Sequence, residues 1–328
     1  LVRDGVVVGE GWHVRAGEAH AEVLALQAAG ESARGATAYV TLEPCNHHGR
    51  TPPCVDALLA AGVSRVVAAM EDPNPLVAGQ GMKRLQAAGV DVSFGLMAAE
   101  ARELNIGFVS RMTRGRPWLR LKAAASLDGR TALNNGQSQW ITSAEARRDG
   151  HRWRARACAI LTGYGTVRDD DPQLNVRDIE TTRQPLRVVV DSRLETPPTA
   201  RVLQGGKTLI VAAIDDPARA TALQAQGAEV LLLANPSGKV DLAALLQELG
   251  RRGINEVHVE AGFKLNGSLL REGLVDELLL YLAPSLIGDA SRGLFNLPEL
   301  ATLSEKRVLQ WRDVRQVGAD LRVIARLT

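Results

Sequence analysis

The chain of 328 residues is long enough for two domains of ordinary size or for one large α/β domain. Hydrophobic residues make up 45% and charged residues 23%, and no apolar run approaches the length that crosses a bilayer, so we expect a soluble protein without a membrane partner. Basic residues number 39 against 37 acidic ones, and neither sign forms a block that would grip a phosphate backbone. A nucleic-acid partner is therefore not expected.

The three cysteines, Cys45, Cys54 and Cys158, are too few for a disulfide framework, and no charged-then-apolar export signal opens the chain. We therefore expect a reducing, cytoplasmic location. The first residues, LVRDGVVVGEGWH, are typical of a β-hairpin that turns at Asp4 and Gly5. This hairpin has no earlier partner strand, so we expect that residues upstream of it are missing.

Residues 1 to about 110 alternate short β-like runs with helical ones. Strands are predicted at 6–11, 36–42, 64–70 and 90–95, and helices at 20–30, 54–62 and 81–89. Gly62 and Gly89 each close a predicted helix and lead into a β-branched run. The alternation predicts a sheet covered by helices.

The segment SRMTRGRP, residues 110–117, is basic, contains Gly115 and Pro117 and lacks apolar periodicity, which favours a linker. Seven strand-like runs follow it, at 118–126, 157–163, 185–191, 207–213, 228–234, 256–262 and 276–284. Helical stretches lie among them, at 242–253 and 265–273. We therefore predict two α/β domains, at residues 1–113 and 114–328.

The first domain carries residues typical of a catalytic zinc site, which has three protein ligands and a fourth position for water. His20 and Glu22 stand at the start of a predicted helix, Cys45 follows a strand, and Cys54 precedes another helix. One His and two Cys supply three ligands, and Glu22 is then placed to move protons, as in zinc-dependent nucleobase deaminases. A Cys45–Cys54 disulfide is the simpler alternative, but it explains neither His20 nor the expected reducing compartment.

Eight residues separate Cys45 from Cys54, where most such deaminases have two. With this insertion, the motifs GEGWHVRAGEAHAE, TLEPCNHHGRTPPC and EDPNPLVAGQG resemble the deaminase domain of the bifunctional riboflavin-biosynthesis deaminase/reductase family. The resemblance implies one zinc ion per chain, held by His20, Cys45 and Cys54, with Glu22 as the proton shuttle. In that family the domain begins with a helix and a P-N-P-type loop, which would lie upstream of Leu1.

The same resemblance implies a set of deaminase substrate-binding residues: His13, Arg50, Asp72 and Asn74. Arg50 would meet the ribose phosphate and the others the pyrimidine or the ribose. Alternatively, residues 72–75 form an ordinary turn and Arg50 is a solvated loop charge. His47 and His48 are interpreted as loop residues that could stand behind the metal ligands.

The second domain has no G-x-G-x-x-G after a strand, so the common dinucleotide fingerprint is missing from its sequence. Glycines follow predicted strands in LTGYGTVRDDDPQLNVR and VEAGFKLNGSLL, where a helix N-terminus could hold a phosphate. Such turns are weak evidence alone, because tight turns use glycine for backbone reasons.

The ordered motifs KAAASLDGRTA, SQWITS, HRWRARACAILTGYGTVRDDDPQLNVR and EAGFKLNGSLLREGLVDELLLYLAP resemble the reductase domain of the same family, which is similar in fold to dihydrofolate reductase and uses NADPH. The resemblance implies cofactor contacts from Ala124, Trp140, Thr166, Asp170, Ser192, Gly262, Phe263, Lys264, Leu265, Asn266, Gly267 and Ser268. It implies substrate contacts from Ser138, Arg154, Leu174, Arg177 and Glu260.

Three residues of the second domain keep alternative interpretations. Trp140 could be a core residue, since tryptophans more often pack than bind cofactors. Asp128 could handle a proton or position a neighbour. Cys158 lies in an apolar run and is interpreted as core.

The family implies a two-step enzyme of riboflavin synthesis. Its first domain would deaminate 2,5-diamino-6-ribosylamino-4(3H)-pyrimidinone 5′-phosphate, and its second would reduce 5-amino-6-(5-phosphoribosylamino)uracil to the ribitylamino product. Small phosphorylated pyrimidines would be the partners, and the chain would form a homo-oligomer, a dimer or a tetramer. One alternative is a nucleoside or tRNA deaminase with a non-catalytic second domain, and another is a binding protein with a four-ligand structural zinc.

Overall fold

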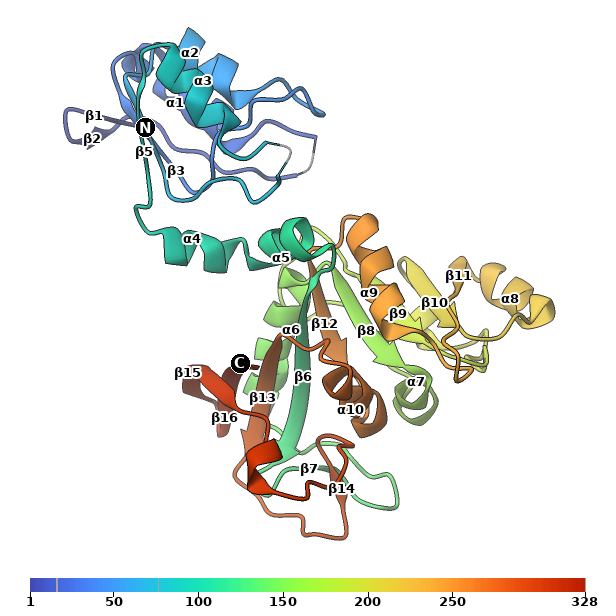
Figure 1. The fold of residues 1–328 in the computed structure, drawn as a ribbon. Coiled ribbons are helices and arrows are strands. Elements are labelled where there is room, and N and C mark those ends of the chain that lie inside the picture. The colour runs from blue at the N-terminus through green and yellow to red at the C-terminus, as the bar shows by residue number, and fades with distance from the viewer. Residues whose placement is uncertain (16, 76, 328) are drawn as a thin grey trace. The chain divides into compact units, whose positions relative to one another are not determined.

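The computed structural model describes residues 1–15, 17–75 and 77–327 (Figure 1). The chain forms two compact units, Leu1–Arg114 and Gly115–Thr328. Among the described residues, no helix has both the length and the apolar character needed to span a membrane.

The first unit is built on a five-stranded sheet in the order β2-β1-β3-β4-β5. β3, β4 and β5 are parallel, while β1 is antiparallel to β2 and to β3. The strands are β1 Val2–Arg3, β2 Val6–Val7, β3 Thr37–Val40, β4 Arg65–Ala68 and β5 Asp91–Phe94. The helical elements are α1 Ala21–Ala29, η1 Gly30–Ala33, α2 Cys54–Ala60, α3 Gln80–Ala87, α4 Ala98–Leu104 and α5 Ile106–Arg114.

Several local predictions for this unit are confirmed. β1 and β2 form the hairpin, with Asp4 and Gly5 both at positive φ in its turn. Gly62 and Gly89 follow α2 and α3 at φ of 70° and 86°, a conformation that glycine adopts without steric cost. The predicted α/β alternation is therefore present, although the strands are shorter than their apolar runs.

The backbone at Gly11 packs closely against α1, and this contact positions the segment that precedes His20. A Cβ atom built on Gly11 would lie 2.7 Å from the carbonyl oxygen of Ala21 in α1, so only glycine fits there. This contact brings the following residue pair, Trp12 and His13, alongside the start of α1.

The prediction of a linker at 110–117 is wrong for its first half. Residues up to Arg114 belong to α5, which buries Ile106 and Val109, and the Arg114 side chain donates to Ser110 Oγ. The apolar positions that define this helix lie before residue 110, so the eight-residue window missed them. The helix ends before Gly115, whose φ is 69°.

The second unit contains a nine-stranded sheet in the order β11-β10-β9-β8-β12-β6-β13-β16-β15. The strands from β11 to β13 run parallel, and the β16–β15 hairpin adds antiparallel to β13. Its strands are β6 Trp118–Ser126, β8 Ala159–Gly163, β9 Leu186–Val190, β10 Thr208–Ala212, β11 Ala228–Leu232, β12 Glu256–Glu260, β13 Glu277–Ala283, β15 Leu309–Val317 and β16 Asp320–Leu327.

A small sheet and the helices complete this unit. β7 Arg130–Ala132 pairs with β14 Arg292–Gly293. The helical elements are α6 Ala144–Arg156, α7 Tyr164–Asp170, η2 Arg201–Leu203, α8 Pro217–Gln224, α9 Leu242–Arg251, α10 Phe263–Arg271 and η3 Leu303–Glu305.

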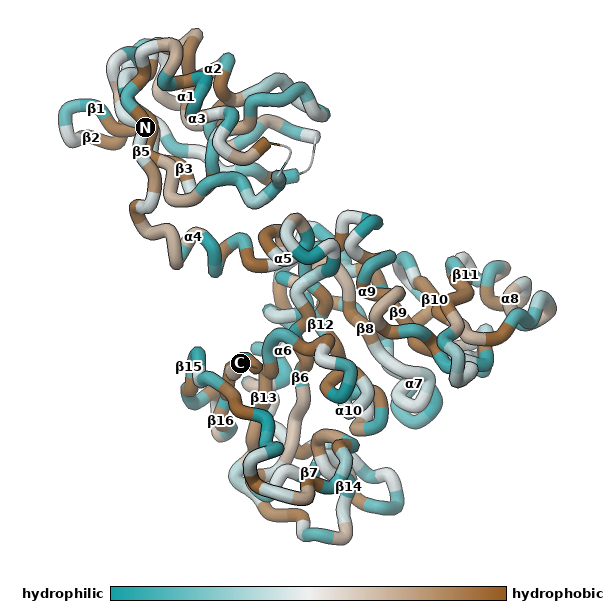
Figure 2. Tube along the Cα trace, in the orientation of Figure 1, coloured by the Kyte–Doolittle hydropathy of each residue, from teal (hydrophilic) through white to brown (hydrophobic). Residues whose placement is uncertain are grey.

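Both faces of the inner strands β8, β9 and β10 are buried, which explains their nearly continuous apolar runs. Leu161 packs with leucines of α9 and α10 on one face, while its neighbour Ile160 packs with Val189 and Ile210 on the other. Figure 2 shows hydrophobic residues along β9 and β10. At β13 the face opposite α9 and α10 is covered by α6, where Trp153 packs near Leu279.

All seven predicted strands of the second domain are present, but several elements were not predicted, among them α6, β15 and β16. The helix α6 has the sequence AEARRDGHRWRAR. Only a few of its residues are buried, and most of the rest are charged, so the sequence shows no apolar periodicity. The hairpin β15–β16 was missed because β15 is an exposed edge strand, with Trp311 65% and Val314 53% exposed, so it lacks an apolar run.

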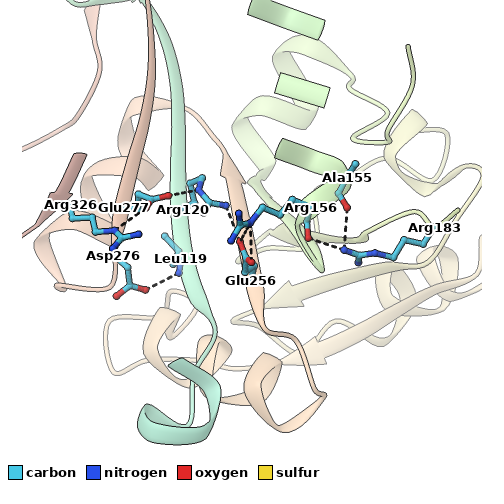
Figure 3. A network of polar contacts seen from close by, with 9 residues as sticks. All are labelled: Leu119, Arg120, Ala155, Arg156, Arg183, Glu256, Asp276, Glu277 and Arg326. Carbon is cyan, nitrogen blue, oxygen red and sulfur yellow. Dashed lines mark hydrogen bonds and ion pairs between the residues drawn. The ribbon is translucent and has the colours of Figure 1, made fainter. Parts of the chain in front are cut away.

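A buried chain of charges crosses the centre of the sheet (Figure 3). Arg120 of β6 is 2% exposed and donates to Glu277 of β13 and, over 3.0 Å, to Glu256 of β12. Arg156 binds the outer side of Glu256, and Arg326 binds that of Glu277. Each buried carboxylate thus has two cationic donors, which offsets the cost of removing it from water.

We predict that Arg120→Met lowers the free energy of unfolding of the second unit by about 3 kcal/mol, because it removes the shared partner of two buried carboxylates. Urea unfolding would measure the loss. Arg148→Met is the control, since Arg148 is exposed on α6, and it should change stability by less than about 0.5 kcal/mol. Equal stability of the two variants would contradict a structural role for the charge chain.

Candidate active sites

Three metal-ligating side chains meet where α1 and α2 begin. His20 directly precedes α1, Cys54 is the first residue of α2, and Cys45 lies on the loop after β3. His20 Nδ1 is 3.2 Å from Cys54 Sγ and 3.5 Å from Cys45 Sγ. The three ligand atoms lie within 4.8 Å of one another. The structure thus brings together the three ligands predicted from the sequence.

The donor set and its spacing fit zinc. Bonds of 2.0–2.3 Å at tetrahedral angles place neighbouring N and S ligands about 3.5 Å apart, close to the distances seen here. His20 turns its other ring nitrogen, Nε2, towards Thr51 Oγ1 at 3.4 Å, a contact that sets the ring orientation. Thr51 is not among the residues predicted from the sequence, where its only signal is a hydroxyl three residues before a ligand.

The two thiols share their protons unequally. The hydrogen bond with Cys54 lowers the pKa of Cys45 to about 5, and the same contact raises the pKa of Cys54. A second negative charge at this pair is therefore unfavourable without a cation, which is the condition that a metal ion satisfies. Burial raises the pKa of Glu22, which also contacts Cys54, so this carboxyl group is suited to accept and return a proton.

Two of the predicted deaminase substrate residues lie against this centre. The His13 ring meets the His20 ring edge-on, with centroids 5.1 Å apart. Asp72 is half-buried, and burial is the main cause that raises its pKa; the Asn74 backbone N–H and His47 oppose the rise, while the charges of Glu43 and Cys45 add to it.

The other two predicted residues are held less closely. Asn74 donates its backbone N–H to Asp72 Oδ1 over 2.8 Å, so the 72–75 segment is a turn whatever else it does. Arg50 is exposed and lies beside Gly17. His47 and His48 are exposed loop residues.

In the second unit the carboxyl ends of β6, β8 and β12 meet at one edge of the sheet, where Gly262 and Thr166 lie close together. A Cβ atom at Gly262 would be 3.9 Å from Thr166 Oγ1. Gly262 precedes α10 in extended conformation and leaves the first N–H groups of this helix without intrahelical partners. This arrangement fits the phosphates of a dinucleotide.

Phe263–Ser268 are the first residues of α10, so the helix predicted at 265–273 begins two residues earlier than expected. Within this stretch Asn266 and Gly267 face the interior. Asn266 donates to the carbonyl oxygen of Ala261, and a Cβ atom at Gly267 would lie 2.2 Å from the carbonyl oxygen of Asn296. Gly267 is required for packing.

Glu260, the last residue of β12, is held in a cluster of cations. Arg154 binds both of its carboxylate oxygens, Nη2 at 2.8 Å, and Lys122 Nζ lies 4.0 Å away. Burial opposes ionisation, but Arg154 and Lys122 hold the pKa of Glu260 well below its ordinary value. Arg154 also donates to the carbonyl oxygen of Asn175, so it is not free for a phosphate.

Three comparisons identify relatives of the chain. Residues 117–323 match the RibD C-terminal domain, and residues 1–70 match the zinc-binding region of cytidine and deoxycytidylate deaminases. The riboflavin biosynthesis protein RibD of Escherichia coli is 52% identical in an alignment of 334 positions. The alignment covers 98% of this chain and 90% of that protein.

Solved structures agree. That of Acinetobacter baumannii RibD superposes with a TM-score of 0.92 at 44% identity, covering all of this chain and 90% of the other. A deaminase/reductase from Thermotoga maritima has a TM-score of 0.87 at 30% identity, with the same coverage. The chain belongs to the RibD family. It is a bifunctional deaminase and reductase of riboflavin biosynthesis.

Membership of the RibD family confirms the predicted fold, a cytidine-deaminase-like domain followed by a dihydrofolate-reductase-like domain. It also confirms the cofactors, with zinc at His20, Cys45 and Cys54 and NADPH for the reductase. Phosphorylated pyrimidines are the substrates that the family implies.

Two alternatives for the RibD reductase unit can now be corrected. Trp140 is not core: it is 68% exposed and stacks on Arg147, whose Cζ lies 4.4 Å from the ring centroid. Cys158 lies just before β8 and is half-buried, so it is not a strand core residue.

Asp128 anchors a loop. Its carboxylate accepts from Ser126 Oγ and from the backbone N–H groups of Ile287 and Gly288, and these bonds lower its pKa to about 2. An acid held so firmly in its ionised form is a poor proton donor near neutral pH. Asp128 is thus a positioning residue.

The remaining predicted reductase residues are spread over several elements. Ala124 lies on β6, and Ser138 is half-buried in the loop after β7. Ser192 Oγ accepts from the Val240 N–H over 3.3 Å, and burial raises the pKa of Asp170 at the end of α7.

The segment 174–177 lies beside Arg154. Leu174 has its side chain in the core and φ of 49°, so only its backbone can reach a substrate. Arg177 is exposed, and its guanidinium contacts Asn175 Oδ1 over 3.1 Å. Its backbone N–H donates to Nδ1 of buried His151, a residue that the sequence analysis missed.

We predict a pH-dependent contribution of His151 to stability. Burial, with the charges of Arg154 and Arg177, lowers its pKa to about 4. Since an unfolded histidine titrates near pH 6.5, the unfolded chain binds the extra proton first. The contribution of His151 to the free energy of unfolding is therefore present at neutral pH and is lost as the pH falls from about 6.5 to about 4.

His151→Gln should make the loss between about pH 7 and pH 4.5 smaller by about 2 kcal/mol, measured by urea unfolding. The exposed-histidine variant His48→Gln should keep the full loss. An identical pH slope for the wild type and His151→Gln would contradict this account.

Proposed function

We propose that the first unit deaminates 2,5-diamino-6-ribosylamino-4(3H)-pyrimidinone 5′-phosphate and that the second reduces 5-amino-6-(5-phosphoribosylamino)uracil. The single observation that carries the first step is the group of His20, Cys45 and Cys54 with Glu22 in contact with Cys54. The relative from Thermotoga maritima is described with these two activities.

In the proposed deaminase reaction Glu22 moves the protons. Zinc, when bound, activates water as a nucleophile. The Glu22 carboxylate takes the proton of the attacking water, gives it to a ring nitrogen of the pyrimidine and then helps to protonate the leaving amine. His13, Asp72 and Asn74 would hold the pyrimidine or the ribose, and exposed Arg50 would meet the phosphate. Ammonia is released.

In the proposed reductase reaction the chain supplies orientation and charge. NADPH, when bound, would supply a hydride to C1 of the ribosyl group; the bond between C1 and the ring oxygen breaks, and that oxygen takes a proton from solvent to give the ribityl chain. The cofactor would lie over the proposed contacts Ala124, Trp140, Thr166, Asp170, Ser192 and the α10 segment 262–268. Lys264 and Ser268 are better placed for this than buried Asn266 and Gly267.

The reductase substrate residues would contact different parts of the substrate. They are Ser138, Arg154, Leu174, Arg177 and Glu260. Glu260, paired with Arg154, would accept hydrogen bonds from the pyrimidine N–H groups. Of the two arginines, Arg154 is bound to Glu260 and Arg177 is exposed, so Arg177 would bind the phosphate. Ser138 and the Leu174 backbone would lie beside the substrate.

We also propose that the enzyme acts in the cytoplasm as a homo-oligomer, a dimer or a tetramer. Among the described residues β15 is the edge strand of the nine-stranded sheet, and it exposes Trp311 and Val314, which is unfavourable for an isolated chain. Sedimentation of the purified protein should therefore show no monomer at micromolar concentration.

Glu22→Gln tests the two-site proposal. Ammonia release from the diaminopyrimidine should fall at least about 100-fold, because the proton shuttle is lost. NADPH oxidation with supplied deaminated substrate should not change. Glu31→Gln, an exposed change in the same unit, is the matched control and should keep both activities. Loss of both activities in Glu22→Gln would refute two independent sites.

A further inference from the structure

Glu43, two residues before the zinc ligand Cys45, is the most completely bonded carboxylate of the first unit's described residues. It is 4% exposed. Its Oε1 accepts from the backbone N–H groups of Gly81 at 2.8 Å and Met82 at 3.3 Å, and its Oε2 from those of Gly79 at 2.8 Å and Asp72 at 3.1 Å. Four backbone donors from two segments therefore converge on one side chain.

These bonds tie together three parts of the deaminase site. The Glu43 backbone N–H donates to the Met70 carbonyl oxygen at the end of β4, so the residue is held from both ends. Gly79, Gly81 and Met82 form the start of α3, where free N–H groups and the helix dipole favour a negative charge. Asp72 belongs to the turn that bears the proposed substrate contacts.

The start of α3 also touches the cysteine loop directly. A Cβ atom at Gly81 would lie 2.1 Å from the carbonyl oxygen of Pro44, the residue between Glu43 and Cys45. Further along the helix, Arg84 donates to Asn46 Oδ1 over 2.8 Å. The cysteine loop, the Asp72 turn and α3 thus meet around one carboxylate.

We propose that Glu43 is a positioning residue that sets Asp72 and Asn74 at a fixed distance from the Cys45 side of the zinc site. It acts through the backbone of the Asp72 turn and touches neither substrate nor metal. This inference rests on the proposed deaminase function, because it gives Asp72 and Asn74 a substrate to hold.

A purely structural role predicts a different result. The zinc ligands His20 and Cys54 receive no bond from Glu43, so displacing the Asp72 turn should weaken substrate binding while the metal stays in place. A residue that only stabilises the fold, or only holds Cys45, would lower the zinc content and kcat together.

The test uses Glu43→Gln in the full chain. The amide keeps the size of the side chain but replaces one accepting oxygen with an NH2 group that faces backbone donors. We expect the KM for the diaminopyrimidine in ammonia release to rise about tenfold, the scale of one charge-assisted hydrogen bond, with kcat changing less. Zinc content should stay at that of the wild type, and reductase kinetics with supplied deaminated substrate should not change.

Glu31→Gln is the control, since Glu31 is exposed in the same unit and should leave all parameters unchanged. Unchanged deaminase kinetics in Glu43→Gln would overturn the proposal, as would loss of zinc and kcat at constant KM. If Glu43→Gln fails to fold, Gly81→Ala decides: it presses α3 away from Pro44, so an elevated KM supports the proposal and an unchanged KM overturns it. A wild-type protein that releases no ammonia would refute the proposed function itself.

Discussion

Unpaired backbone N–H groups at helix starts are the constraint on which both sites depend. A parallel strand ends where a helix must begin, and the first N–H groups of that helix have no partner within it. In the first unit His20 directly precedes α1 and Cys54 is the first residue of α2. The N–H groups at the start of α3 donate hydrogen bonds to Glu43. In the second unit the start of α10, preceded by Gly262, lies beside Thr166.

The two units handle buried charge differently. The first buries Glu43 against neutral backbone donors and leaves its reactive thiols needing a cation. The second compensates carboxylates with arginines, in the chain centred on Arg120 and again at Glu260. The first arrangement creates a place for a metal ion, and the second fixes the charge of a carboxylate at the carboxyl end of β12.

The sequence predicted the metal site because its chemistry is local. A His and two Cys at helix and strand ends have few other uses, so three ligands and Glu22 could be named in advance. Apolar alternation likewise predicted the buried strands of the large sheet. The charged helix α6 and the exposed strand β15 were missed, since their burial depends on the rest of the fold.

Long-range pairing was beyond the reach of sequence patterns. Nothing local shows that Arg154 binds Glu260 across 106 positions, that Glu43 collects N–H groups from α3, or that His151 supports the 174–177 segment. Each of these contacts joins residues that the fold alone brings together. The linker prediction failed for a similar reason, because the buried residues Ile106 and Val109 of α5 precede the basic segment 110–117.

The most direct test of a two-site enzyme is to incubate the purified protein with the diaminopyrimidine nucleotide, with and without NADPH, and to follow ammonia and NADPH absorbance together. The account predicts ammonia release in both cases and NADPH oxidation only after deamination has begun. NADPH oxidation without ammonia release, or ammonia release that requires NADPH, would contradict it.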